Sequence, residues 1–131
     1  MDRVFLDANV LVSAALKPGS RLARLWDLDD VRLLGSPYVL EEARRNVTEP
    51  AAAPRLERLI GAMVVLPSEP SDFEIAEDPG LPAKDRPVLL AAIVSGADLL
   101  LTGDMTHFGG CMGRSVSGVR VSLPGDYLRT R

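Results

Sequence analysis

A chain of 131 residues with 47% hydrophobic and 25% charged residues has the balance of a globular protein, and its length predicts one domain over residues 1–131. The net charge of −3 argues against a globally basic nucleic-acid binder, although a pocket of acids that holds cations can still act on nucleic acid. The first 20 residues lack the basic start of a signal peptide, the lone Cys111 excludes an intrachain disulfide, and no apolar run is long enough to span a bilayer, so we expect a cytoplasmic protein without a membrane segment.

The N-terminal half alternates short apolar runs with segments of helical spacing. In chain order it predicts a strand over residues 4–6, a helix over 10–16, a helix over 21–26, a strand over 31–34, a helix over 37–47, a helix around 56–60 and a strand over 63–66. The clearest boundary is Ser36-Pro37, which combines a favoured N-cap with proline at the first helical position.

The C-terminal half begins with a predicted loop over residues 67–82, which are rich in proline, serine and acids. Pro87 then opens a helix over 88–94 that is apolar on all sides, followed by a strand over 99–102, a last strand over 119–123 and a short polar tail. Continuously apolar strands that alternate with helices indicate a parallel sheet covered on both faces. The sequence therefore predicts a doubly wound α/β domain.

Polar residues beyond the carboxyl ends of the strands form the binding site in folds of this class. Asp7 and Asn9 directly follow the first strand, where both helix capping and a ligand-binding role fit. In the helix that begins at Pro37, Glu41 points away from the apolar stripe, whereas Glu42 lies at the edge of that stripe. Glu41 is therefore interpreted as a surface charge and Glu42 as the candidate ligand.

Two further acids occupy comparable positions in the C-terminal half. Asp85 precedes the all-apolar helix, and taken alone its simplest interpretation is an N-cap. Asp104 follows the fourth strand and Gly103, either in a tight turn or as an acid displayed at the edge of the sheet. His107 is the single histidine of the chain and is interpreted as a surface or packing residue outside the candidate site. Cys111 is left out of the site as well.

Four carboxylates gathered at one edge would repel one another without a cation. Hard oxygen ligands suit Mg²⁺ or Mn²⁺ rather than zinc. An acidic cluster without a nucleophilic serine–histidine pair or a phosphate-binding glycine loop is typical of metal-assisted phosphodiester hydrolysis. The set of Asp7, Glu42, Asp85 and Asp104 therefore predicts this chemistry.

The four acids stand in segments that resemble the ordered motifs of PIN-domain proteins, a family that includes the VapC-type toxins of bacterial toxin–antitoxin pairs. The segments are FLDANVLVSA, SPYVLEEARRNV, KDRPVLLAA and ADLLLTGD, and the resemblance covers about residues 3–108. Each motif is one acid in an apolar frame, so the specificity of the resemblance comes from the order of the four.

The resemblance implies a PIN-like three-layer α/β/α domain with a central parallel sheet of about five strands. It also implies a Mg²⁺- or Mn²⁺-dependent ribonuclease that cuts single-stranded RNA and leaves a 5′-phosphate, a homodimer, and a small neutralising antitoxin as partner. Matched by position, the catalytic and metal-binding acids are Asp7, Glu42, Asp85 and Asp104, and the supporting residues are Asn9 and Thr102.

Two features of the chain depart from the family pattern. Many relatives carry another acid shortly after the Thr-Gly-Asp motif, where this chain has Met105, Thr106 and His107, so the number of metal ions stays open. Asp78, in the acidic loop, competes for the role of Asp85, which has the better helix context.

Three alternatives compete with the nuclease. A haloacid-dehalogenase-type phosphatase shares Phe-Leu-Asp-x-Asn, but Asn9 takes the place of the second carboxylate and cannot transfer a proton. A signalling receiver domain needs a phosphoacceptor aspartate at the end of the third strand, where Pro67, Ser68 and Glu69 stand. A non-catalytic PIN-like module that binds RNA or protein ranks below the enzyme because all four acids are present.

Overall fold

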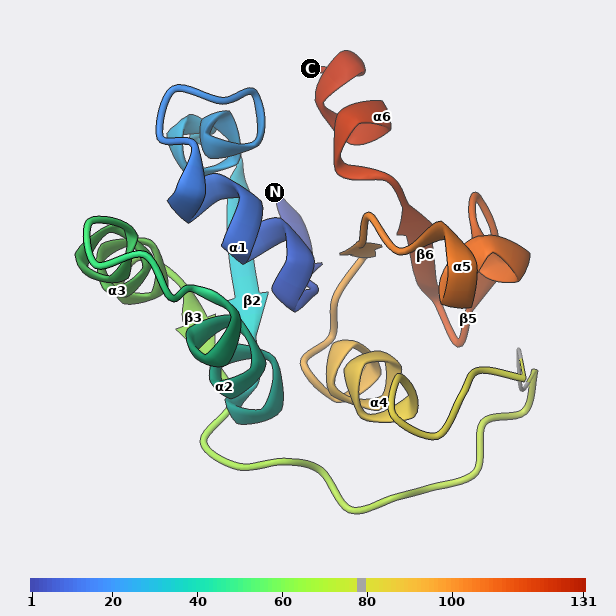
Figure 1. Ribbon diagram of the computed structural model, residues 1–131. Coiled ribbons are helices and arrows are strands. Elements are labelled where there is room, and N and C mark those ends of the chain that lie inside the picture. Colours follow the sequence, from blue (N-terminus) through green and yellow to red (C-terminus); the bar gives the residue numbers. More distant parts are fainter. Residues whose placement is uncertain (78–79) are drawn as a thin grey trace.

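The computed structural model describes residues 1–77 and 80–131 (Figure 1). In chain order its elements, in which η marks a 3₁₀ helix, are β1 (Asp2–Leu6), α1 (Ala8–Leu16), η1 (Leu22–Asp27), β2 (Val31–Gly35), α2 (Pro37–Asn46), α3 (Ala52–Gly61), β3 (Val64–Val65), α4 (Arg86–Val94), β4 (Leu99–Leu101), α5 (Met105–Phe108), η2 (Gly109–Cys111), β5 (Ser115–Val116), β6 (Val119–Ser122) and α6 (Pro124–Arg129). The predicted strands and the main helices are all present.

The strands form one sheet in the order β3-β2-β1-β4-β6-β5, with β5 antiparallel to β6 and every other neighbouring pair parallel. This mostly parallel sheet is flanked by helices, which confirms the predicted α/β fold. The sixth strand, β5, was not predicted. It forms a hairpin with β6 through Ser117 and Gly118, whose φ angles of 49° and 84° are typical of the type I′ turn that suits a two-residue hairpin.

The core is built around the two central strands. Val4, Phe5 and Leu6 of β1 and Leu100 and Leu101 of β4 have no exposed surface, which explains why both strands read as continuous apolar runs. Helices α1, α2 and α3 pack against one another, while α4 contacts β2 and β4 (Figure 1). No helix in the described part of the chain has the length and apolar character needed to cross a membrane.

The C-terminal tail differs from the prediction. Instead of a polar tail, residues 124–129 form α6, with Pro124 in its first turn and both Tyr127 and Leu128 buried. The Tyr127 hydroxyl donates a hydrogen bond of 2.7 Å to Asp2 at the start of β1. The apolar residues three and four positions after the proline give α6 a buried face, because they pack where the two ends of the chain meet.

The strand order fixes where the ends of the central strands meet. From β1 the chain proceeds outward to β2 and β3, whereas β4 lies on the other side of β1 and is followed outward by β6. The switch in direction therefore lies between β1 and β4, the place where open α/β sheets bind ligands. Leu6 pairs with Leu101 at this point, so Asp7 and Thr102 follow side by side.

Candidate active site

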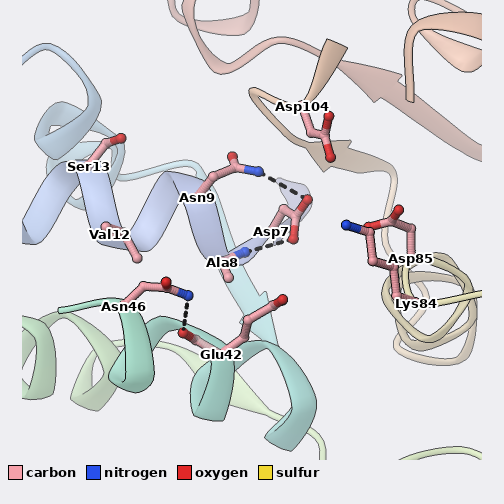
Figure 2. Close-up of a pocket in the computed structure, with 10 residues that line it drawn as sticks. All are labelled: Asp7, Ala8, Asn9, Val12, Ser13, Glu42, Asn46, Lys84, Asp85 and Asp104. Atoms are coloured by element: carbon pink, nitrogen blue, oxygen red, sulfur yellow. Dashed lines mark hydrogen bonds between the residues drawn. The ribbon is translucent and has the colours of Figure 1, made fainter. Parts of the chain in front are cut away.

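A cavity of about 430 Å³ opens at this switch point. Asp7, Glu42, Asp85 and Asp104 all line it, and they come from the ends or faces of four different elements. Figure 2 shows the four carboxylates facing a common space. The structure thus brings together the four acids that the sequence selected.

Asp7 lines the cavity and is only 5% exposed. Its Oδ1 caps α1 by accepting a 2.8 Å hydrogen bond from the Ala8 N–H, so the capping interpretation holds for this oxygen. Its Oδ2 accepts a second bond of 2.8 Å from the Thr102 hydroxyl and a third of 3.2 Å from the Asn9 amide. Capping therefore accounts for one oxygen, while the other is tied to the end of β4.

Burial raises the pKa of Asp7 above its ordinary value, and the negative charges of Glu42 and Asp85 act in the same direction. The hydrogen bonds from Thr102 and Ala8 oppose this shift by favouring the carboxylate, but they do not outweigh it. The Asp7 carboxyl group therefore accepts hydrogen bonds but lies in a buried environment that disfavours its ionisation. A nearby cation would reverse that preference.

Asn9 and Thr102 connect the two loops that carry Asp7 and Asp104. The Asn9 carbonyl oxygen accepts a 2.8 Å hydrogen bond from the Gly103 N–H, and the Thr102 hydroxyl accepts one of 3.1 Å from the Asp104 N–H. Asn9 and Thr102 therefore hold the Asp7 carboxylate in a fixed position relative to the backbone of residues 103 and 104. The Asn9 amide is fully engaged in this bridge.

Glu42 reaches the cavity from α2. The helical phase predicted from sequence is the one observed, because Glu42 is half-buried beside the cavity while its neighbour Glu41 is exposed. Val39, Leu40 and Ala43 fill the buried side of the helix and fix its rotation. The adjacent Asn46 also lines the cavity, and its amide donates to the Glu42 backbone carbonyl rather than to the side chain.

Asp85 occupies the N-cap position of α4, but its side chain makes no capping hydrogen bond. Its Oδ2 is buried and has no hydrogen-bond partner among the described residues, although the side chain is only 14% exposed. The segment just before it is held in place by the Tyr38 hydroxyl, which donates a 2.7 Å bond to the Lys84 carbonyl. The capping interpretation therefore does not explain the Asp85 carboxylate.

Asp104 caps the short helix α5 through a 3.0 Å hydrogen bond from the His107 N–H to its Oδ1. Its Oδ2 lies 2.7 Å from Nδ1 of the His107 ring. Burial opposes ionisation of Asp104, but the hydrogen bonds from the backbone and ring of His107 outweigh it and lower its pKa. Asp104 therefore favours the carboxylate form, with one oxygen on the backbone N–H of His107 and the other on the His107 ring.

His107 is the residue that sequence reasoning left out. Its Nδ1 lies 3.1 Å from Oδ2 of Asp85 as well, and the ligand atoms of Asp85, Asp104 and His107 all lie within 4.8 Å of one another. The spacing of Asp104 and His107 could have indicated the contact, since side chains three residues apart share a helix face. Asp78, the competing acid, lies outside the described residues.

A family model described as PIN domain matches residues 3–106. The chain belongs to the PIN-domain family. The matched range contains all four acids of the cavity together with the Asn9 and Thr102 bridge.

The fold of this PIN domain is similar to solved structures of VapBC proteins. DNA-bound VapBC from Salmonella typhimurium has a TM-score of 0.64 at 18% identity, over 95% of this chain and 99% of the other. VapBC2 from Rickettsia felis, bound to a promoter DNA fragment, has a TM-score of 0.64 at 14% identity, over 91% and 96%. VapC20 from Mycobacterium tuberculosis, a toxin that cleaves the sarcin–ricin loop, has a TM-score of 0.54 at 20% identity, over 81% and 95%. A search of curated proteins found no match.

The donor set of this PIN domain fits a divalent cation. Three carboxylates with different surroundings, Asp7, Asp85 and Asp104, face the cavity with Glu42, and oxygen donors are the ligands that Mg²⁺ and Mn²⁺ take. The buried Asp85 Oδ2 without a hydrogen-bond partner is the observation that tests the fit, because such an oxygen is stabilised by a cation. Asp7 and Glu42 stand outside the tighter group that Asp85 and Asp104 form with His107.

We expect Thr102→Val to destabilise the PIN domain by about 2 kcal/mol in urea unfolding. Valine has nearly the same shape, but it cannot donate to the buried Asp7 carboxylate or accept from the Asp104 N–H. Thr102→Ser keeps the hydroxyl and should retain most of the stability. Equal losses for valine and serine would show that packing of the methyl group, rather than the hydrogen bonds, determines the effect.

Proposed function

We propose that this PIN domain is a Mg²⁺- or Mn²⁺-dependent endoribonuclease that hydrolyses phosphodiester bonds of single-stranded RNA. The supporting observation is the convergence of Asp7, Glu42, Asp85 and Asp104 on one open cavity at the switch point of the sheet. These acids would hold the cation and are the proposed catalytic residues. Asn9 and Thr102 support them by fixing the loops after β1 and β4.

When bound, the cation would supply positive charge for the phosphate and lower the pKa of an attacking water. Other residues of the chain set the positions of the acids. Thr102 and Asn9 orient the Asp7 carboxylate, and the first turn of α5 orients Asp104. Ser13 and Lys84 line the same cavity, where a hydroxyl and an ammonium group suit contacts to phosphate oxygens.

The proposal extends to a role as the toxin of a toxin–antitoxin pair in the cytoplasm. It is supported by the fold likeness to VapBC proteins and by the four acids. The partners would be a small antitoxin and a second copy of the chain. Expression of this protein should arrest growth, and coexpression of a small DNA-binding protein encoded beside it should restore growth. Unimpaired growth with active enzyme would favour a housekeeping nuclease.

The test of the activity is cleavage of a labelled single-stranded RNA. We expect cleavage with Mg²⁺ or Mn²⁺ and none in excess chelator, because carboxylates alone cannot offset the charge of the phosphate. A phosphomonoester such as p-nitrophenyl phosphate should stay intact, whereas its hydrolysis would favour the phosphatase. Cleavage of RNA at the same rate with and without chelator would overturn the metal-dependent mechanism.

A further inference from the structure

The His107 ring stands between two of the four acids. Its Nδ1 lies 2.7 Å from Oδ2 of Asp104 and 3.1 Å from Oδ2 of Asp85. Only the contact to Asp104 has the alignment of a hydrogen bond, since the Asp85 oxygen has no hydrogen-bond partner among the described residues. One nitrogen and two carboxylate oxygens therefore converge on one point from two different elements.

The position of the ring is set by the fold. His107 belongs to α5, which begins at Met105 directly after its N-cap Asp104, and the Asp104 side chain accepts the hydrogen bond from the His107 N–H. The next residue, Phe108, has no exposed surface and anchors the short helix in the core. His107 itself is 27% exposed, so the ring lies at the border of the cavity with its Nδ1 directed inward.

The two Nδ1–oxygen distances are compatible with a shared coordination sphere. Ligand atoms bound about 2.1 Å from one ion at right angles are separated by about 3 Å, which is close to the two Nδ1–oxygen distances observed. A cation could thus be reached by all three atoms with little movement. Imidazole nitrogen is accepted by first-row transition metals, whereas Mg²⁺ is bound by oxygen.

We propose that His107 is a protein ligand of the bound cation through Nδ1, together with Asp85 and Asp104, and that it makes this site favour Mn²⁺ over Mg²⁺. The ring must then carry its proton on Nε2. This proposal rests on the metal dependence proposed above.

Mn²⁺ alone is the probe, and the protein is the full chain with any histidine tag removed. Because the chain has a single histidine, imidazole nitrogen coupled to Mn²⁺ in pulsed electron paramagnetic resonance must come from His107. We expect ¹⁴N modulation in the wild type and a change to the ¹⁵N pattern when the protein is labelled with ¹⁵N-histidine. This test needs no substitution, so it does not depend on the folding of a variant.

Binding titrations provide a second measurement. His107→Gln should weaken Mn²⁺ binding about tenfold or more while changing Mg²⁺ binding about threefold or less. Thr106→Ala alters the exposed neighbour in the same helix and should leave both affinities unchanged. Equal weakening of both ions by His107→Gln would overturn the proposed selectivity.

The outcomes separate this proposal from the proposed function. Mn²⁺ that binds and supports RNA cleavage without nitrogen modulation would overturn the role of His107 and leave the ribonuclease intact. Wild-type protein that binds neither ion would overturn both. Nitrogen modulation together with the selective loss of Mn²⁺ affinity would establish His107 as a ligand.

Discussion

The Glu42→Gln protein should cleave single-stranded RNA at least about 100-fold more slowly than the wild type, whereas Glu41→Gln should cleave at nearly the wild-type rate. The two residues are adjacent, but successive side chains on a helix point about 100° apart. Glu42 lines the cavity and Glu41 is exposed. Glutamine is close in size to glutamate, so the comparison removes a charge without changing the packing of α2.

The measurement is the initial rate of cleavage of one labelled RNA at saturating Mn²⁺, with thermal melts of both variants. The slow Glu42→Gln protein also controls for contaminating ribonuclease, since a contaminant would cleave equally in both variants, which are purified in the same way. Melting temperatures close to that of the wild type would show that a slow variant is still folded. Loss of activity in Glu41→Gln with retention in Glu42→Gln would show that the cavity is not the active site.

The metal-free Asp85→Asn protein should be more stable than the wild type at pH 7.5, by on the order of 1 kcal/mol. Asp85 is one of the charges that raise the pKa of Asp7, after burial and Glu42. Asparagine relieves this repulsion and sacrifices no cap, because the Asp85 side chain makes no capping hydrogen bond. Asp7→Asn is a less direct test, since Asp7 accepts three hydrogen bonds on its two oxygens.

The raised pKa of Asp7 determines how the free energy of unfolding changes with pH. The raised pKa of Asp7 means that its contribution to the free energy of unfolding is fully present below the ordinary value of 3.8 and is lost as the pH rises through the higher folded-state value. The stabilisation by Asp85→Asn requires an ionised Asp7, so it should appear as the pH rises through the raised folded-state pKa of Asp7 and disappear below that value. Urea unfolding at a series of pH values measures both curves.

Adding Mn²⁺ should reverse the order of stability. At 100 times its dissociation constant, an ion that binds only the folded state stabilises the wild type by about 2.7 kcal/mol, and a variant with tenfold weaker binding gains roughly half of that. Asp85→Ala serves as the control for capping. An N-cap would make alanine destabilising by about 1 kcal/mol, with asparagine neutral and Mn²⁺ without effect. That pattern would contradict a metal site at Asp85.

The sequence by itself determined the class of the fold and the identity of the converging acids. Continuous apolar runs such as Val4–Leu6 are local patterns, and they predict buried parallel strands because both faces of such strands are covered. The carboxyl ends of neighbouring parallel strands meet at one edge, so Asp7 and Asp104 could be placed there in advance. The helical phase distinguished Glu42 from Glu41 for the same reason, since rotation about a helix follows from spacing alone.

Only the tertiary structure decided which groups each polar side chain contacts. Asp85 has a favourable capping position in the sequence, yet its carboxylate faces the cavity, because the loop before α4 is positioned by contacts with α2. His107 was interpreted as a surface or packing residue, and it lies against Asp85 because the chain turns back through β4 and places α5 beside the residue that precedes α4. Residues 124–129, predicted as part of a polar tail, form α6, and the Tyr127 hydroxyl of this helix donates a hydrogen bond to Asp2 at the start of β1. Contacts of this kind depend on the relative positions of separate segments, which local propensity and periodicity do not encode.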